Sequence, residues 1–280
     1  MSYIASSELD KEIVLDPAIQ PLPGELNLNP QPQAVLVTGV TGFIAAFLIA
    51  ELLETTPAQI YGFVRANDVD HGMARIRENM ERYALWRPEY QQRIIPVPGD
   101  LKKPLLGLEP QYFQYLAETV EAIYHSGSKL SYIAPYGFLK AANVGGTEEA
   151  LRLATTGRAK PFHFISSLGI LLNYKALVGG QEDAPLDCNK CPEVGYFQTK
   201  YVAEGLTRLA RDRGIPVTIH RIGLIVGDSR SGLSNFDDFV SRIILGCIEA
   251  GDAPDIHTAM DMTPVDYIAK AIIYLSFNKA

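Results

Sequence analysis

The sequence lacks the features that mark several specialised classes of protein. It has only three cysteines among 280 residues, too few for a disulfide scaffold, and this number fits a reducing compartment. It has no basic excess either, because 25 Lys and Arg stand against 32 Asp and Glu and give a net charge of −7. An acidic balance gives no support to a nucleic-acid partner, which usually requires a basic patch. The remaining composition is that of an ordinary globular protein.

Long apolar segments are missing as well. The longest apolar run, 43–50, ends at Glu51 and is far shorter than the roughly 18 residues that a membrane-spanning helix needs. The N-terminus lacks the basic and apolar regions of a secretory signal. We therefore expect a soluble, cytoplasmic protein with no membrane partner.

Short β-type runs alternate with helical patterns from residue 34 onwards. Strands are expected at 34–38, 60–64, 94–97, 122–124, 162–165 and 217–220, and helices at 43–54, 72–83, 111–118, 136–154 and 196–213. Alternation of this kind, with nearly continuous apolar strands, predicts a parallel sheet covered on both faces. The expected fold class is therefore α/β, with a doubly wound parallel sheet (Rossmann fold) as the leading topology.

The two ends of the chain depart from this alternation. Residues 1–33 are rich in Pro, Asn, Gln and Leu without a sustained period, which is typical of an extended leader or linker laid over a neighbour. Residues 34–280 are expected to form the dinucleotide-binding domain, in which 222–280 contribute the substrate side through helices at 236–250 and 265–276. The last helix runs almost to the end of the sequence, which suggests an excised domain.

A glycine-rich turn follows the first expected strand and opens the first expected helix. It reads Thr38-Gly-Val-Thr-Gly-Phe-Ile-Ala45. Gly39 permits the tight turn, Gly42 lets the backbone approach a pyrophosphate, and Ala45 replaces a third glycine where only a small residue is needed. The free N–H groups and the dipole of the helix N-terminus favour an anion there. In this strand–turn–helix context the motif predicts a dinucleotide site.

The end of the second strand indicates which dinucleotide binds. Arg65 stands where an NAD-preferring site would place an acid, and a guanidinium pairs with the 2′-phosphate of NADPH. Asp68 and Asp70 follow in the loop and could reverse this preference. Asp100, after the third strand, either accepts a hydrogen bond from the adenine amino group or belongs to a plain turn. We expect NADPH to be the cofactor.

A serine and a Tyr–Lys pair supply candidate catalytic groups. Ser167 follows the fifth strand, and Tyr196 and Lys200 lie four residues apart on one helix face. An ammonium beside a phenol is expected to lower the phenol pKa from about 10 towards the working pH. Tyr196 would protonate a carbonyl oxygen as hydride reaches the carbon, while Ser167 steadies that oxygen. Tyr136 and Lys140 have the same spacing but precede any serine-bearing strand end, so we interpret them as an ordinary helix pair.

Several other reactive side chains have a structural interpretation. Cys188 and Cys191 invite a metal site, but zinc normally takes four ligands and only Cys247 remains, so no metal is expected. His125 is interpreted as a packed residue at a strand end. Asp266 is interpreted as a cap of the last helix.

Several segments, in order along nearly the whole chain, carry a resemblance that is more specific than any single motif. They are Val14-Leu-Asp-Pro-Ala-Ile19, 35–43, Phe63-Val-Arg65, His125-Ser-Gly127, Asn143-Val-Gly-Gly-Thr147, 221–229 and Pro264-Val-Asp266. In these segments the chain resembles extended short-chain dehydrogenase/reductases, and specifically the terminal thioester reductase domains of polyketide and non-ribosomal peptide synthetases. Carboxylic acid reductases carry similar domains.

The resemblance implies a catalytic set and a cofactor site. Ser167, Tyr196 and Lys200 would be catalytic, and Tyr196 and Lys200 would also contact NADPH. The other residues implied at the cofactor are Thr38, Gly39, Thr41, Gly42, Phe43 and Ile44 at the pyrophosphate, Arg65 at the 2′-phosphate, Asp100 and Leu101 at the adenine, and Ser126 and Gly127 near the ribose. Asn143 matches a helix asparagine of the family that is more often structural than catalytic.

The resemblance also implies an activity and a partner. Such a domain would use NADPH to reduce an acyl or peptidyl thioester on the phosphopantetheine arm of a carrier protein, releasing an aldehyde or, after a second reduction, an alcohol. It would be a monomeric domain of a multidomain synthase. These domains usually continue well past a Pro-Val-Asp motif, so cofactor binding is better supported here than full turnover. Two alternatives stay open: a sugar-nucleotide epimerase or dehydratase, which would prefer NAD and an acid at position 65, and a protein that binds NADPH without catalysis.

Overall fold

A six-stranded parallel sheet forms the centre of the computed structural model, which describes residues 4–23, 31–172, 182, 184–255 and 261–278. Its strand order is β3-β2-β1-β4-β5-β6. The strands are β1 (Ala34–Thr38), β2 (Gln59–Val64), β3 (Ile94–Pro98), β4 (Ala122–His125), β5 (Phe162–Ser167) and β6 (Val217–Ile222). Each lies within two residues of its expected bounds, and the predicted fold class is confirmed. The strand order reverses between β1 and β4, where doubly wound sheets bind ligands at the carboxyl ends of their strands.

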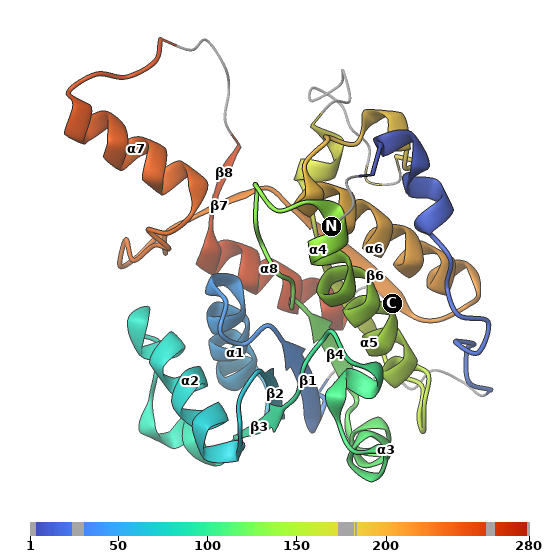
Figure 1. Ribbon diagram of the computed structural model, residues 1–280. Coiled ribbons are helices and arrows are strands. Elements are labelled where there is room, and N and C mark those ends of the chain that lie inside the picture. Colours follow the sequence, from blue (N-terminus) through green and yellow to red (C-terminus); the bar gives the residue numbers. More distant parts are fainter. Residues whose placement is uncertain (1–3, 24–30, 173–181, 183, 256–260, 279–280) are drawn as a thin grey trace.

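Helices cover both faces of the sheet (Figure 1). On one face lie α1 (Phe43–Thr55), α2 (Val69–Arg82) and α8 (Val265–Asn278), and on the other α3 (Pro110–Thr119), α4 (Tyr136–Lys140), α5 (Gly146–Ala154) and α6 (Gly195–Asp212). Successive residues of β1 face opposite layers: Val35 and Val37 pack in the core with α1 and α8, whereas Leu36 packs in the core with α5 and α6. Burial on both faces explains why the strands read as continuous apolar runs.

The helix expected over 136–154 is divided in the structure. Between α4 and α5, Ala141–Gly145 form a π-helical turn that contains Asn143. The Asn143 side chain accepts a hydrogen bond from the N–H of Lys129 at 2.6 Å and donates to the backbone oxygen of Lys129 at 3.0 Å. It also donates to Oγ1 of Thr199 at 2.9 Å. Asn143 therefore joins the loop after β4 to helix α6, in a π turn of the kind often found at functional sites.

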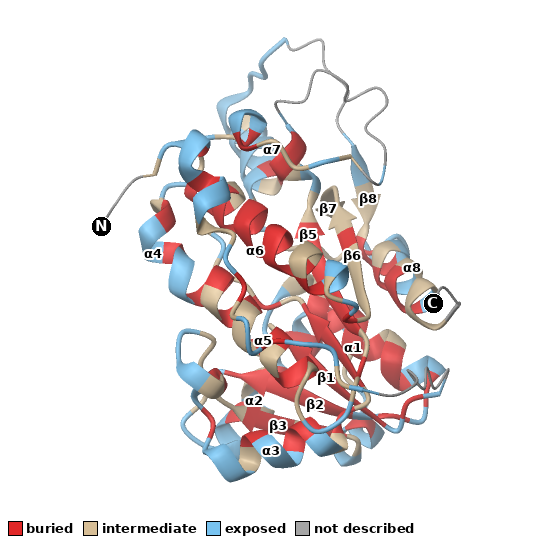
Figure 2. Ribbon diagram, turned by 90° about the vertical axis from the view of Figure 1, so that its right-hand side faces the viewer, coloured by how far each residue is buried: buried red, intermediate tan, exposed pale blue. Residues whose placement is uncertain are grey.

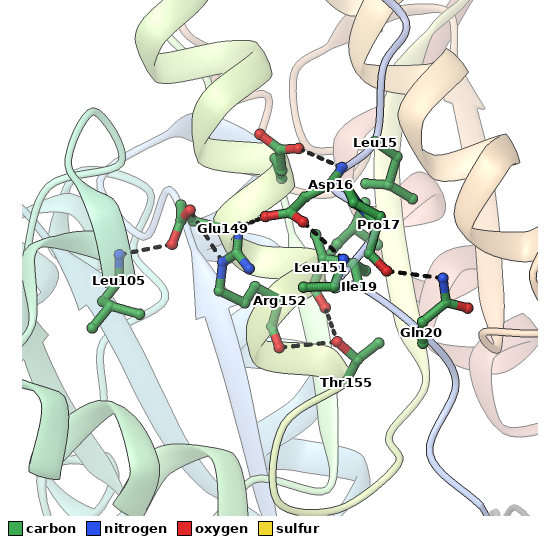
Figure 3. A network of polar contacts seen from close by, with 12 residues as sticks. Leu15, Asp16, Pro17, Ile19, Gln20, Leu105, Glu149, Leu151, Arg152 and Thr155 are labelled. Carbon is green, nitrogen blue, oxygen red and sulfur yellow. Dashed lines mark hydrogen bonds and ion pairs between the residues drawn. The ribbon is translucent and has the colours of Figure 1, made fainter.

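The leader packs against the domain that follows it. Ser6–Glu12 form a short 3₁₀ helix instead of an extended segment, and Leu15 and Ile19 are buried in the core on the α5–α6 side. Figure 3 shows how polar contacts add to this packing: the Asp16 carboxylate pairs with Arg152 of α5 at 2.8 Å. The leader is thus held by both apolar and ionic contacts.

The second Tyr–Lys pair of the sequence also holds the leader. Tyr136 donates its phenolic proton to Glu12 at 2.8 Å, and Nζ of Lys140 lies 2.5 Å from the same carboxylate oxygen. The Lys140 contact is the main cause of a lowered Glu12 pKa. The pair therefore has a structural partner in the leader. Residues 24–30 of the expected leader lie outside the described residues.

Two short strands that the sequence did not predict follow β6, together with the helices that it did predict at 236–250 and 265–276. The strands β7 (Leu224–Val226) and β8 (Met262–Pro264) form a separate two-stranded parallel sheet. Helix α7 (Phe239–Ala250) lies apart from the large sheet, and its residues are mostly exposed (Figure 2). Asp266 accepts hydrogen bonds from the N–H and Oγ of Ser229 at 2.9 and 2.7 Å, so it anchors the loop after β7, a role beyond the expected helix cap. None of the helices within the described ranges has the length and apolar character to cross a membrane.

Candidate active site

The glycine-rich turn between β1 and α1 brings two backbone segments into close contact. Gly39 has φ +76°, and a Cβ there would lie 2.7 Å from Cα of Gly127, in the segment after β4. Gly42 is the N-cap of α1 and supplies no capping side chain, and the first turn of α1 has no acidic residue. The N–H groups of this helix N-terminus are therefore available to an anion such as a pyrophosphate.

Asn79 of α2 holds the same turn from outside. Its Nδ2 donates to the backbone oxygens of Val40 and Gly42, at 3.0 Å each, and its side chain is buried. A single asparagine within a helical pattern gave no signal of this role in the sequence. The predicted pyrophosphate residues differ in exposure: Thr38 is buried, Gly39, Phe43 and Ile44 are half-buried, and Thr41 and Gly42 are exposed.

Thr38, the last residue of β1, connects the turn to β4. Its Oγ1 lies 2.9 Å from Nδ1 of His125 and accepts a hydrogen bond from the N–H of Gly127 at 2.9 Å. The other ring nitrogen of His125 lies 3.1 Å from Oγ1 of Thr147. Burial lowers the pKa of His125 to about 3, so the ring is neutral at pH 7. His125 is thus the packed strand-end residue that the sequence predicts.

Arg65 lies exposed directly after β2, at the carboxyl edge of the sheet. Its backbone oxygen accepts a hydrogen bond from the guanidinium of Arg75 on α2, a second cation that the sequence analysis missed. Asp68 is the N-cap of α2, and its carboxylate accepts from the N–H of His71 at 2.7 Å. This edge therefore presents two guanidinium groups, while one of the two acids in the following loop is engaged in a helix cap.

Asp100 and Leu101 lie in the turn after β3. The Asp100 carboxylate accepts a hydrogen bond from the N–H of Lys102 at 3.0 Å. This bond is typical of a plain turn, which is one of the two interpretations of Asp100 given above. Leu101 packs beside Gly127, because a Cβ on that glycine would lie 2.9 Å from Cδ1 of Leu101. Ser126, just before this glycine, is half-buried. An adenine contact of Asp100 stays a prediction.

Tyr196 and Lys200 lie in α6 and are 8% and 4% exposed. Nζ of Lys200 donates a hydrogen bond to the backbone oxygen of Ile165 at 2.7 Å, which ties the lysine to the carboxyl end of β5. The Ser128 side chain, in the segment after β4, acts on the Tyr196 hydroxyl and favours a lower pKa. Sequence reasoning missed Ser128, although it adjoins the 125–127 motif.

Burial governs the ionisation of both residues. It raises the pKa of Tyr196 to about 12, an effect that the Ser128 side chain only partly offsets. It also lowers the pKa of Lys200 to about 8, although the nearby Glu204 carboxylate acts in the opposite direction. The expected decrease of the Tyr196 pKa is therefore wrong, because desolvation penalises the phenolate more than its surroundings stabilise it. At pH 7 Tyr196 is a neutral phenol, which carries the proton that a general acid must donate.

Ser167 ends β5 and caps the short 3₁₀ helix Leu168–Leu171 that follows. Its Oγ accepts from the N–H of Gly169 at 3.0 Å, so its O–H is available to donate to another acceptor. The preceding residue, Ser166, is buried and donates to the carboxylate of Glu204 at 2.6 Å. Successive strand residues face opposite sides of the sheet. Since the Ser166 hydroxyl is bonded to Glu204, Ser167 is the one of the two with a hydroxyl left for a ligand.

Glu204, one helical turn after Lys200, is fully buried in an ion-pair network. Its carboxylate accepts from Nη2 and Nε of Arg221 at 2.6 and 3.1 Å and from Nε of Arg208 at 3.1 Å. Together with Ser166, these bonds join α6 to β5 and β6. The signal for Glu204 was present in the sequence, at four residues from Lys200 on the same helix face.

Cys188 and Cys191 are both buried as free thiols. Burial raises both pKa values, that of Cys191 to about 12. Within the part of the chain that the structure describes, no group of three or more His, Cys, Asp or Glu side chains is placed to hold a metal ion.

The chain is similar to known reductase domains over nearly its whole length. An NAD-binding family model described as "Male sterility protein" matches residues 37–272. A component of the linear gramicidin synthase of Brevibacillus parabrevis is 43% identical over 99% of this chain, which spans only 6% of that protein. The terminal R domain of the myxalamid PKS-NRPS pathway is 43% identical, with a TM-score of 0.89 over 98% of this chain and 70% of that one.

A reductase domain of a nonribosomal peptide synthetase from Mycobacterium tuberculosis is 29% identical, with a TM-score of 0.76 over 99% of this chain and 70% of that one. The two solved domains share the fold of this chain, and one is a reductase (R) domain while the other is a terminal R domain. The chain therefore belongs to the extended short-chain dehydrogenase/reductase family of oxidoreductases, among the terminal reductase domains of nonribosomal peptide and polyketide synthases.

Proposed function

We propose that the protein uses NADPH to reduce an acyl or peptidyl thioester, held on the phosphopantetheine arm of a carrier protein, to an aldehyde. The observation that carries this proposal is the convergence of candidate groups on adjacent strand ends. Lys200 is hydrogen bonded to Ile165 of β5, Tyr196 interacts with Ser128 after β4, and Thr38 joins the end of β1 to Gly127. Ligands of doubly wound sheets bind at such strand ends.

The residues around the turn fit NADPH. A Cβ at Gly39 would fill the narrow space beside Gly127, and the uncapped N-terminus of α1 suits the pyrophosphate. Arg65 would pair with the 2′-phosphate, with Arg75 beside it, because guanidinium groups bind phosphate by charge-assisted hydrogen bonds. Asp68 is engaged in its helix cap, so it does not compete for the ribose as an acid would. When bound, NADPH supplies the hydride.

The side chains have complementary tasks in this proposal. Tyr196, protonated because of its high pKa, gives its hydroxyl proton to the thioester oxygen as negative charge develops there, and Ser128 orients the phenol. Ser167 donates its O–H to the same oxygen. Lys200, cationic below a pKa of about 8, stabilises the phenolate that Tyr196 becomes. The resulting hemithioacetal releases the pantetheine thiol and leaves the aldehyde, and a second reduction would give the alcohol.

The relatives support the partner in this proposal. Two similar solved domains come from a PKS-NRPS pathway and from a nonribosomal peptide synthetase, and synthases of this kind carry their intermediates on carrier proteins. Arg65 argues against the sugar-nucleotide alternative, which would favour NAD and an acid at that position. We further propose that residues 34–280 form the reductase domain and that 222–280 provide its substrate side.

The test is to incubate the protein with NADPH and an acyl-pantetheine and to measure aldehyde, free thiol and oxidised cofactor. We expect all three to form in proportion. Tight NADPH binding without any product would favour the non-catalytic alternative. Turnover of a sugar nucleotide with bound NAD, and none of the thioester, would favour the epimerase.

A further inference from the structure

Aromatic rings form a continuous cluster from Tyr196 to the surface. The ring of Tyr132, in the loop after β4, has its centroid 6.2 Å from that of Tyr196, 5.9 Å from that of Phe197 and 5.7 Å from that of Phe239 on α7. The exposed fraction rises along the cluster, from 8% for Tyr196 to 44% for Tyr132 and 58% for Phe239. The cluster therefore leads from the candidate proton donor to solvent.

The loop that carries Tyr132 is fixed at both ends. At one end both backbone groups of Lys129 are bonded to the side chain of Asn143, at 2.6 and 3.0 Å. At the other end the backbone of Ala134 lies so close to α6 that a Cβ on Gly195 would be 2.3 Å from its oxygen. A ring held in this way loses little conformational entropy when a ligand covers it.

The loop that carries Tyr132 exposes two large apolar side chains. Leu130 and Ile133, in the same loop, are 57% and 93% exposed. The ammonium group of Lys129, in the same loop, lies over the Phe138 ring of α4, with Nζ 3.7 Å from the ring centroid. Exposed apolar residues that gather at one place on a soluble protein commonly mark a ligand or partner site.

We propose that Tyr132 and Phe239 form an apolar wall that binds the acyl chain of the substrate, so that the protein prefers thioesters of apolar acyl groups several carbons long to acetyl thioesters. This inference rests on the proposed function, because it places the thioester carbonyl at Tyr196. The first carbons of the chain then lie against Tyr132 and the later ones against Phe239. Each methylene group that leaves water against these rings strengthens binding about fourfold.

The test compares acetyl-, butanoyl- and octanoyl-pantetheine as substrates. The unaltered protein is expected to show the highest kcat/KM with octanoyl-pantetheine. In Tyr132→Ser this value should fall about tenfold or more, and the value for acetyl-pantetheine should fall much less, because the acetyl group places a single carbon against the wall. Tyr132→Phe should keep the preference, since it retains the ring.

Tyr115 on α3 provides a matched control. It is 48% exposed and also contacts two aromatic rings, those of Tyr61 and Tyr112. Tyr115→Ser should leave the ratio of octanoyl to acetyl kcat/KM unchanged. Phe239→Ser, on an exposed helix, is a second test variant and should reduce the octanoyl value in the same direction as Tyr132→Ser.

A binding measurement separates this inference from the proposed function. Calorimetric titration uses pantetheine analogues in which an amide replaces the reducible thioester, with the same acyl groups. The protein could form no aldehyde and still bind longer acyl groups more tightly, with Tyr132→Ser abolishing this dependence on chain length. That result would refute the proposed function and support the apolar wall. An octanoyl-to-acetyl ratio that is near one, or that neither Tyr132→Ser nor Phe239→Ser alters, overturns the wall.

Discussion

Nζ of Lys200 donates a hydrogen bond to the backbone oxygen of Ile165 at 2.7 Å, so the candidate lysine of α6 is fixed to the strand that ends in Ser167. The lysine is 4% exposed, and its burial favours the neutral amine. A fixed cation of this kind can stabilise a phenolate at Tyr196 only while it stays protonated. The ionisation of Lys200 should therefore be visible in the reaction.

Reduction is expected to slow as the pH rises through about 8. Burial lowers the pKa of Lys200 to about 8, so the group is charged below this pH and loses its proton above it. Above the pKa, kcat/KM should fall about tenfold for each pH unit, because one proton is lost from the active form. The measurement is kcat/KM with an acyl-pantetheine over a range of pH on both sides of this value. A profile that stays flat well above it would remove Lys200 from its proposed role.

Glu204→Gln is expected to destabilise the protein strongly. The change leaves the Arg221 guanidinium, which bonds Glu204 at 2.6 Å, buried without its counter-charge. Loss of one partner from a buried ion pair costs about 3 kcal/mol or more in the free energy of unfolding. Urea denaturation measures this loss.

Glu81→Gln is the control for that measurement. Glu81 pairs with Arg77 at 2.7 Å, but both side chains are about half exposed, so the loss should be about 0.5 kcal/mol or less. Equal losses for the two variants would show that the buried network does not stabilise the fold.

Arg65→Ser should weaken NADPH binding selectively. The charge-assisted hydrogen bonds of a guanidinium to the 2′-phosphate are worth about 1.5–3 kcal/mol, so the NADPH Kd should rise at least about tenfold. NADH lacks this phosphate, and its Kd should stay nearly unchanged. Calorimetric titration of both dinucleotides measures the difference, and Arg77→Ser, an exposed arginine of α2, is the control. Equal weakening of both dinucleotides would contradict the assignment.

Gly39→Ala tests the close contact in the glycine-rich turn. Alanine is strained at φ +76°, and its Cβ would also lie 2.7 Å from Cα of Gly127. Gly232→Ala is a matched control, because Gly232 has φ +71° with nothing within 4 Å of the added Cβ. The backbone strain, about 1–2 kcal/mol, is common to both variants, so any further loss of unfolding free energy in Gly39→Ala measures the contact. Equal losses would mean that the turn can open away from Gly127.

The six strands and the glycine-rich turn could be predicted because their sequence signals are local. Val35, Leu36 and Val37 are all buried, since helices cover both faces of β1, and this produces a continuous apolar run. The positions of Gly39 and Arg65 follow from the strand ends that precede them. β7 and β8 have three residues each, which is too short for a recognisable pattern.

The features that the sequence did not predict depend on contacts between distant segments of the chain. The π turn at Asn143 is held by Lys129 and Thr199, and no local pattern in the sequence announces it. Tyr132 is one aromatic residue in a loop without a period. The predicted direction of the Tyr196 pKa shift was wrong, because the spacing to a lysine is visible in a sequence, whereas the extent of burial is not.

The central claim is that Tyr196 delivers the proton to the substrate at a bound NADPH. It is tested most directly by a single-turnover experiment with Tyr196→Phe, in which loss of the reduced nicotinamide absorbance is followed after mixing with octanoyl-pantetheine. We predict that the rate falls at least about 100-fold while the NADPH Kd changes less than about twofold. A Tyr196→Phe variant that turns over as fast as the unaltered protein would contradict the claim.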